Sequence, residues 1–141
     1  MARKPLTITR ARGLAEGVVA KAQTVNQSGS HFHLVTRIAL FGSMLTTCEG
    51  SVGDVDLGLE LRARLDGDDG RKLFAAEMGT APASFHHTYL WPEERLWRHL
   101  RARRPEISLH TMQEVVEHGY PHRVIYQFDP MTGLDFVDLP W

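Results

Sequence analysis

The sequence predicts a mixed α/β fold, an α+β arrangement in which a small mixed sheet is flanked by helices. Some segments carry apolar residues at helical spacing, and others alternate apolar with polar residues as half-buried strands do. The patterns follow the order helix, strand, turn, strand, helix, strand, helix, strand, which favours helices packed on a sheet. With 141 residues, of which 43% are hydrophobic, the chain fits one domain over residues 1–141.

A helix and a strand are predicted first. Thr7 or Thr9 caps the helix, whose apolar residues recur at helical spacing until the polar, glycine-containing stretch 26–30. Residues 34–41 are apolar and often branched, and their number suits a single strand.

The second strand follows a glycine–serine turn. Gly42-Ser43 comes directly after the first strand, a short helix or turn is expected at 44–48, and a loop at 49–53. Residues 54–61 then alternate polar with apolar side chains, which predicts a strand with one buried and one polar face.

Two helices are predicted next. The sequence Asp-Gly-Asp-Asp-Gly at 66–70 favours a turn, residues 72–78 a short helix, and the breaker-rich residues 79–84 a linker. Pro92 opens the second helix, because proline suits a first helical position, and Pro105 stops it.

Strands and helices are also expected to alternate in the C-terminal third of the chain. Residues 106–110 predict a short strand, and Thr111 with Glu114 forms a capping box for another helix. A last strand is expected at 123–128. The tail 129–141 is expected to be irregular, but its apolar side chains need cover from this domain or from a partner.

Composition limits the classes of function. The formal net charge of -1 gives no global basic field, so nucleic-acid binding is not indicated, although a local basic patch is not excluded. The single cysteine, Cys48, suits a reducing cytoplasm. Residues 1–5 are basic but no apolar core follows them, so we expect no secretory signal, and no apolar run is long enough for a membrane span.

Two aspartates suggest a metal site. Asp54 and Asp56 should project from one side of a strand, while Val55 and Leu57 face the core. Neighbouring carboxylates repel each other when both are ionised, and a hard cation such as Mg²⁺ relieves that repulsion. Just upstream, Gly42 allows a backbone to approach a phosphate closely, and a short helix starting at Ser43 favours an anion. The two segments therefore predict metal and phosphate sites side by side.

The segment 40–57 resembles the motif of the polymerase-beta-type nucleotidyltransferases: an apolar strand, Gly-Ser, a gap of ten residues, then Asp-apolar-Asp. Size and element order are similar to those of the minimal nucleotidyltransferases over roughly residues 34–128. The resemblance implies that Gly42 and Ser43 contact nucleotide phosphates and that Asp54 and Asp56 hold Mg²⁺. It also implies transfer of a nucleoside monophosphate, AMP from ATP, to a hydroxyl on a protein, an RNA or a small molecule.

The third carboxylate of that family has no clear equivalent. Alignment on the strand 106–110 puts Ser108 at the acid position, and serine is not a ligand of comparable charge. Glu106 precedes it by two residues and is the candidate substitute; the alternative is a solvated residue at the start of a strand. His110 is either a general base or a surface residue.

A second departure concerns positive charge. The family often has an arginine shortly after Gly-Ser, whereas residues 44–47 carry none. Arg37, Lys72 and Arg95 are the candidates to supply that charge.

Two other functions stay open. One is that of a catalytically degenerate, antitoxin-like domain that binds a nucleotide or a protein partner. The other is that of an RNA-binding module. The module would use the arginine-rich helix ending near Arg104, with Tyr89, Trp91 and Trp97 stacking on bases.

Overall fold

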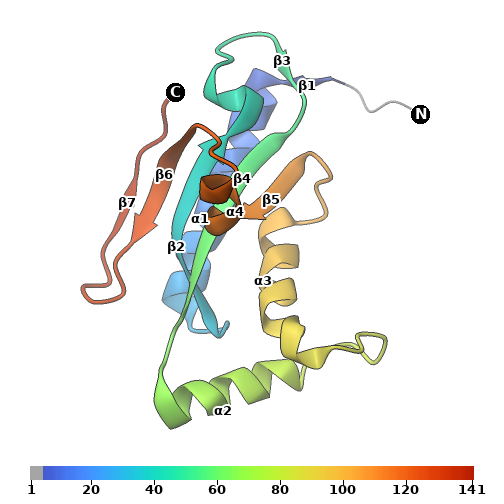
Figure 1. Cartoon of the computed structure of the whole chain (residues 1–141), viewed down its shortest axis with the longest axis vertical. Coiled ribbons are helices and arrows are strands. Elements are labelled where there is room, and N and C mark those ends of the chain that lie inside the picture. Colours follow the sequence, from blue (N-terminus) through green and yellow to red (C-terminus); the bar gives the residue numbers. More distant parts are fainter. Residues whose placement is uncertain (1–4) are drawn as a thin grey trace.

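A five-stranded mixed sheet, in the order β5-β4-β2-β6-β7, forms the centre of the computed structural model (Figure 1). The structure describes residues 5–141, so the basic residues Arg3 and Lys4 lie outside it. A separate two-stranded sheet joins β1 to β3. In chain order the elements are β1 (Leu6–Thr7), α1 (Ile8–Ser28), β2 (His33–Phe41), the 3₁₀ helix η1 (Gly42–Leu45), β3 (Ser51–Val52), β4 (Val55–Ala63), α2 (Gly67–Met78), η2 (Thr88–Leu90), α3 (Trp91–Arg101), β5 (Ile107–Thr111), α4 (Met112–Glu117), β6 (His122–Phe128) and β7 (Asp135–Val137).

The sheet is mixed, as the sequence predicts. β2 lies at its centre and pairs antiparallel with β4 on one side and with β6 on the other. β5 pairs with β4 in parallel, and the long connection between them contains α2 and α3. β7 adds to β6 in antiparallel fashion.

Helices cover both faces of β4. On one face, Val55, Leu57 and Leu59 belong to one hydrophobic cluster with side chains of α1 and α3. On the other face, a Cβ atom at Gly58 would lie 2.9 Å from a methyl group of Val115 in α4. Glycine at this position therefore lets α4 pack directly on the strand.

The boundaries of α1 follow from its sequence. Thr7 is the residue that caps it, because its hydroxyl accepts a hydrogen bond from the Arg10 N–H at 3.2 Å. The helix ends at Gly29, whose φ of 70° is left-handed and favours glycine. The expected end within residues 26–30 is confirmed.

Three expectations from the sequence are wrong. Residues 66–70 do not form a turn: Asp66 is the N-cap of α2, and Asp68 and Asp69 lie in its first turn, where the helix dipole favours acids. The expected loop 49–53 contains β3, which pairs with β1. The tail 129–141 is not wholly irregular, because it contains β7.

This domain itself covers the end of the tail. Leu139 and Trp141 pack against the hydrophobic cluster, and the Trp141 indole N–H donates to Glu16 of α1 at 2.8 Å. Leu134 and Phe136 remain exposed at the β6–β7 hairpin. None of the helices within residues 5–141 has the length and apolar character needed to cross a membrane.

Candidate metal and phosphate site

The glycine–serine turn and the aspartate strand meet at one end of the sheet. β2 ends at Phe41, which stands opposite Asp56 of β4 in the ladder. Between them the chain turns at Gly42, whose φ is 73°. A side chain at Gly42 would collide with the Asp56 carboxylate. Glycine is therefore required here for its backbone conformation and for space, and the two halves of the motif are in direct contact.

Asp54 and Asp56 lie together on the polar side of this strand end. Both are partly exposed, whereas Val55 and Leu57 are fully buried, so the predicted alternation is confirmed. Burial raises the pKa of Asp56, and the negative charge of Asp54 raises it further. A cation would remove the cost of ionising both groups, so the carboxylate pair fits a hard metal ion such as Mg²⁺.

Ser108 stands beside Asp56 on the neighbouring strand. The parallel ladder pairs these two residues, and a hydrogen bond from Ser108 lowers the pKa of Asp56, against the effects of burial and Asp54. Ser108, which the sequence alignment puts at the position of the third acid, therefore lies next to Asp56.

Glu106 has a different partner. It precedes β5, and its carboxylate forms an ion pair with Arg10 of α1 at 2.8 Å. Burial acts to raise the pKa of Glu106, but a backbone hydrogen bond and the Arg10 charge outweigh it and hold that pKa below its ordinary value. Within residues 5–141, no cluster of three His, Cys, Asp or Glu side chains forms a metal site. The structure therefore does not join Glu106 to Asp54 and Asp56 as a third ligand.

A chain of polar contacts leads away from Ser108. Its hydroxyl lies 3.0 Å from His110 Nε2, and His110 Nδ1 lies 3.2 Å from the Glu114 carboxylate. The Phe41 ring meets the His110 ring edge to face, with the ring centres 5.1 Å apart. Sequence reasoning missed the contact between Glu114 and His110, although their spacing of four residues across the start of α4 was an available signal.

The predicted positive charges lie elsewhere. Arg37 is held by Glu60 at 2.6 Å, and Arg95 is held by Glu77 at 3.1 Å and by the Ser30 carbonyl at 2.8 Å. Lys72 belongs to α2, at the opposite end of the molecule from η1 (Figure 1). The structure gathers none of these candidate cations at the Gly42 turn.

The aromatic residues proposed for stacking have structural partners. Trp91 is buried, and its indole N–H donates to Thr80 at 3.1 Å. Trp97 packs against the hydrophobic cluster, and Arg98 lies over the Trp91 ring at 5.2 Å. Of the three rings, Tyr89 is the exposed one. These contacts favour the role of core anchors over that of an RNA platform.

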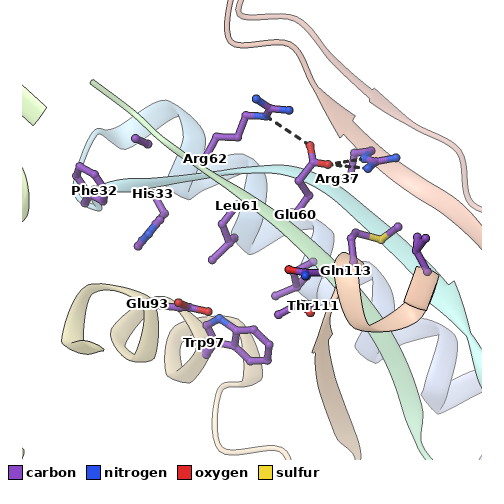
Figure 2. Close-up of a pocket in the computed structure, with 14 residues that line it drawn as sticks. Phe32, His33, Arg37, Glu60, Leu61, Arg62, Glu93, Trp97, Thr111 and Gln113 are labelled. Carbon is purple, nitrogen blue, oxygen red and sulfur yellow. Dashed lines mark hydrogen bonds and ion pairs between the residues drawn. The ribbon is translucent and has the colours of Figure 1, made fainter. Parts of the chain in front are cut away.

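A hollow of about 620 Å³ lies along residues 59–63 of β4 (Figure 2), and its lining includes neither Asp54 nor Asp56. Glu60 sits at its wall between Arg37 and Arg62 and pairs with both, at 2.6 and 3.6 Å. Trp97 and Glu93 of α3 line the other side. The charged groups of this hollow therefore largely satisfy one another.

Comparison with known proteins gives no relative. No protein-family model matches the chain, and the search of curated proteins and the search of solved structures find no match either.

Proposed function

We propose that this protein is a magnesium-dependent nucleotidyltransferase that moves a nucleoside monophosphate, AMP from ATP, to a hydroxyl acceptor. One observation carries the proposal: the Gly42 backbone packs against the Asp56 carboxylate. That contact puts an exposed glycine–serine turn, able to approach phosphates, directly beside a pair of repelling carboxylates.

Each residue has a defined part in this proposal. Asp54 and Asp56 would hold Mg²⁺ together with the phosphates of the nucleotide. The ions would stabilise charge on the attacking and leaving oxygens of the transfer. Gly42 and Ser43, both exposed, would position the phosphates, with Gly42 leaving room for the Asp56 side chain.

One specific observation favours a second candidate function. Ser108 is the residue that pairs with Asp56 on β5, and Glu106 is tied to Arg10. With two carboxylates instead of three, the chain would be a nucleotide- or partner-binding domain of antitoxin-like type that performs no chemistry.

Calorimetric titration of ATP into the wild-type protein, with and without Mg²⁺, tests the proposal. The disabled variant is Asp54→Asn/Asp56→Asn. The matched control is Asp68→Asn/Asp69→Asn. It removes two neighbouring, exposed carboxylates that lie in the first turn of α2, far from the candidate site in sequence. We expect Mg²⁺-dependent binding in the wild type and the control, and at least about tenfold weaker binding, or about 1.4 kcal/mol, in the disabled variant.

Other outcomes separate the two candidates. Absence of ATP binding in the wild type would overturn the nucleotidyltransferase proposal and leave partner binding, a form of the second candidate, standing. Binding that is the same in the disabled variant would exclude the two aspartates as the metal site and leave the partner-binding function as the better explanation.

A further inference from the structure

Ser108, His110 and Glu114 form a serine–histidine–carboxylate relay that the proposed function does not use. The Ser108 hydroxyl lies 3.0 Å from His110 Nε2, and Glu114 lies 3.2 Å from His110 Nδ1. Packing keeps the histidine ring in place, because Phe41 meets it edge to face and is itself buried. This is the geometry that activates a serine hydroxyl: a base within reach of the nucleophile, and a third group that orients the base.

The carboxylate decides which ring nitrogen accepts a proton. Glu114 only accepts hydrogen bonds when ionised, so it holds the proton of a neutral His110 ring on Nδ1. Nε2 then presents its lone pair to Ser108. Glu114 keeps its position because the Glu114 N–H donates to the Thr111 hydroxyl at 3.0 Å, which fixes the first turn of α4.

The other neighbour of Ser108 is Asp56. The two residues are paired across β4 and β5, and the single Ser108 hydroxyl proton can turn either to Asp56 or to His110 Nε2. Asp56 also touches the Gly42 turn. The Ser108 hydroxyl thus lies between a base and the candidate metal and phosphate site. It is partly exposed, so a bound nucleotide can reach it.

We infer that Ser108 is itself a nucleotidyl acceptor, so that the protein transfers AMP from ATP onto its own chain. The inference rests on the proposed function, since it requires ATP and Mg²⁺ at the Gly42 turn and the Asp54–Asp56 pair. It names an acceptor within the chain and gives a chemical role to the serine that stands where an acid is expected.

The step is a substitution at the α-phosphorus of ATP. Ser108 Oγ forms a bond to that phosphorus, and the bond from it to the oxygen that bridges to the β-phosphate breaks. Pyrophosphate leaves with the electron pair of the broken bond. The Ser108 proton moves to His110 Nε2, and Glu114 stabilises the resulting imidazolium ion. The product is a phosphodiester between Ser108 and AMP, with no oxidation or reduction.

The location of the product makes the reaction self-limiting. An AMP group on Ser108 stands beside Asp56 and in the way of a second nucleotide. We therefore expect one AMP on each chain, after which the protein should bind ATP poorly.

Intact-mass measurement of the full chain after incubation with ATP and Mg²⁺, followed by peptide mapping, tests the inference. We expect one added AMP per chain, on the peptide that contains Ser108. Radioactive label should be retained from the α-phosphate of ATP and lost from the γ-phosphate, which distinguishes the reaction from phosphorylation. Ser108→Ala should abolish the adduct, and the exposed Ser84→Ala should leave it unchanged.

Two further variants separate the relay from a purely structural role. Glu114→Gln and His110→Gln should slow adduct formation at least about tenfold while leaving Mg²⁺-dependent ATP binding within about twofold of the wild type. Ser108→Thr keeps a hydroxyl and should restore part of the modification that Ser108→Ala loses. Melting curves of all variants show whether each one is folded.

The outcomes also separate this inference from the proposed function. Mg²⁺-dependent ATP binding without any adduct would overturn the inference and leave the proposed function standing. An adduct on a different residue would likewise overturn it. Absence of Mg²⁺-dependent ATP binding in the wild type would overturn both.

Discussion

Polar residues gather at two ends of the sheet, and their partners differ. Where β2 begins, buried Glu77 receives hydrogen bonds from the Phe32 N–H and Arg95, and Arg64 donates to the last carbonyls of α1. Where β2 ends, Asp56 has Ser108 as its hydrogen-bonding neighbour and has Asp54 as a repelling one. The carboxylate and guanidinium of the first group bond backbone atoms inside the fold. The carboxylates of the second group face other polar side chains at a partly exposed surface.

The comparison shows that a buried charge by itself does not indicate function. Glu77 is only 5% exposed, yet its carboxylate has a structural role, because it joins the start of β2 and α3 to α2. Asp56 is less buried but has a raised pKa, because burial and a like charge act together. Two like charges held close together at a partly exposed surface are thus the better sign of a ligand site. Three substitutions test this contrast.

Glu77→Ala should have the largest effect on stability. It leaves the Phe32 N–H without its carboxylate acceptor and Arg95 without its counter-ion, at a cost of about 3 kcal/mol. Urea unfolding measures this loss. Binding of ATP with Mg²⁺ should be unchanged at a temperature where the variant is folded. Loss of ATP binding in a folded Glu77→Ala protein would contradict the claim that the group around Glu77 serves stability and not ligand binding.

Gly42→Ala should have the next largest effect, and Gly133→Ala is its matched control. The two glycines have nearly the same left-handed φ, 73° and 72°, so alanine costs each about 1 kcal/mol from the backbone. A Cβ at Gly133 meets no atom within 4 Å, whereas one at Gly42 collides with Asp56. Unfolding experiments should show an additional loss of about 1 kcal/mol for Gly42→Ala.

Ligand binding separates these two variants more sharply. Only Gly42→Ala should weaken Mg²⁺-dependent ATP binding, because it displaces the Asp56 carboxylate. Equal ATP affinity in both variants would show that contact between turn and strand has no part in binding.

The smallest expected effect is a pH dependence of stability, caused by His31 near the start of β2. Burial lowers the pKa of His31 from 6.5 to about 4, and the nearby charges of Arg95 and Arg64 and the His99 ring act in the same direction. The unfolded chain therefore binds a proton more readily than the folded one below about pH 6.5. Stability should be complete above that pH and fall by about 1–2 kcal/mol as the pH drops to 5.

His31→Gln should remove part of this pH dependence. Burial also lowers the pKa of His33 and His99, so the remaining part should persist. Urea unfolding at pH 7 and pH 5 measures the difference, with the exposed His86→Gln as control. An identical pH dependence in wild type and His31→Gln would contradict the assignment to His31.

The features predicted correctly from sequence are those encoded by neighbouring residues. The alternation around Asp56 and the cap at Thr111 depend on a few adjacent positions, and both are present. Residues 66–70 were misassigned because the same aspartates and glycines suit a turn and a helix start equally. The Arg10–Glu106 ion pair joins segments that are far apart in sequence, so no pattern of neighbouring residues predicts it. The alignment of Ser108 with the third acid stays a prediction. The link from Ser108 through His110 to Glu114 depends on where α4 begins, which the residues around Ser108 do not determine.

The most direct test puts a carboxylate at the position of Ser108. Ser108→Asp would place a carboxylate opposite Asp56 in the β4–β5 ladder, beside the Asp54–Asp56 pair. Calorimetric titration of Mg²⁺ should show binding at least about tenfold tighter than in the wild type, or about 1.4 kcal/mol, with the exposed Ser84→Asp unchanged. Without Mg²⁺ the variant should melt at a lower temperature than the wild type, because the added charge is repelled by its neighbours. Unchanged or weaker Mg²⁺ binding in a folded Ser108→Asp protein would contradict the claim that Ser108 stands at the acid position of a metal site.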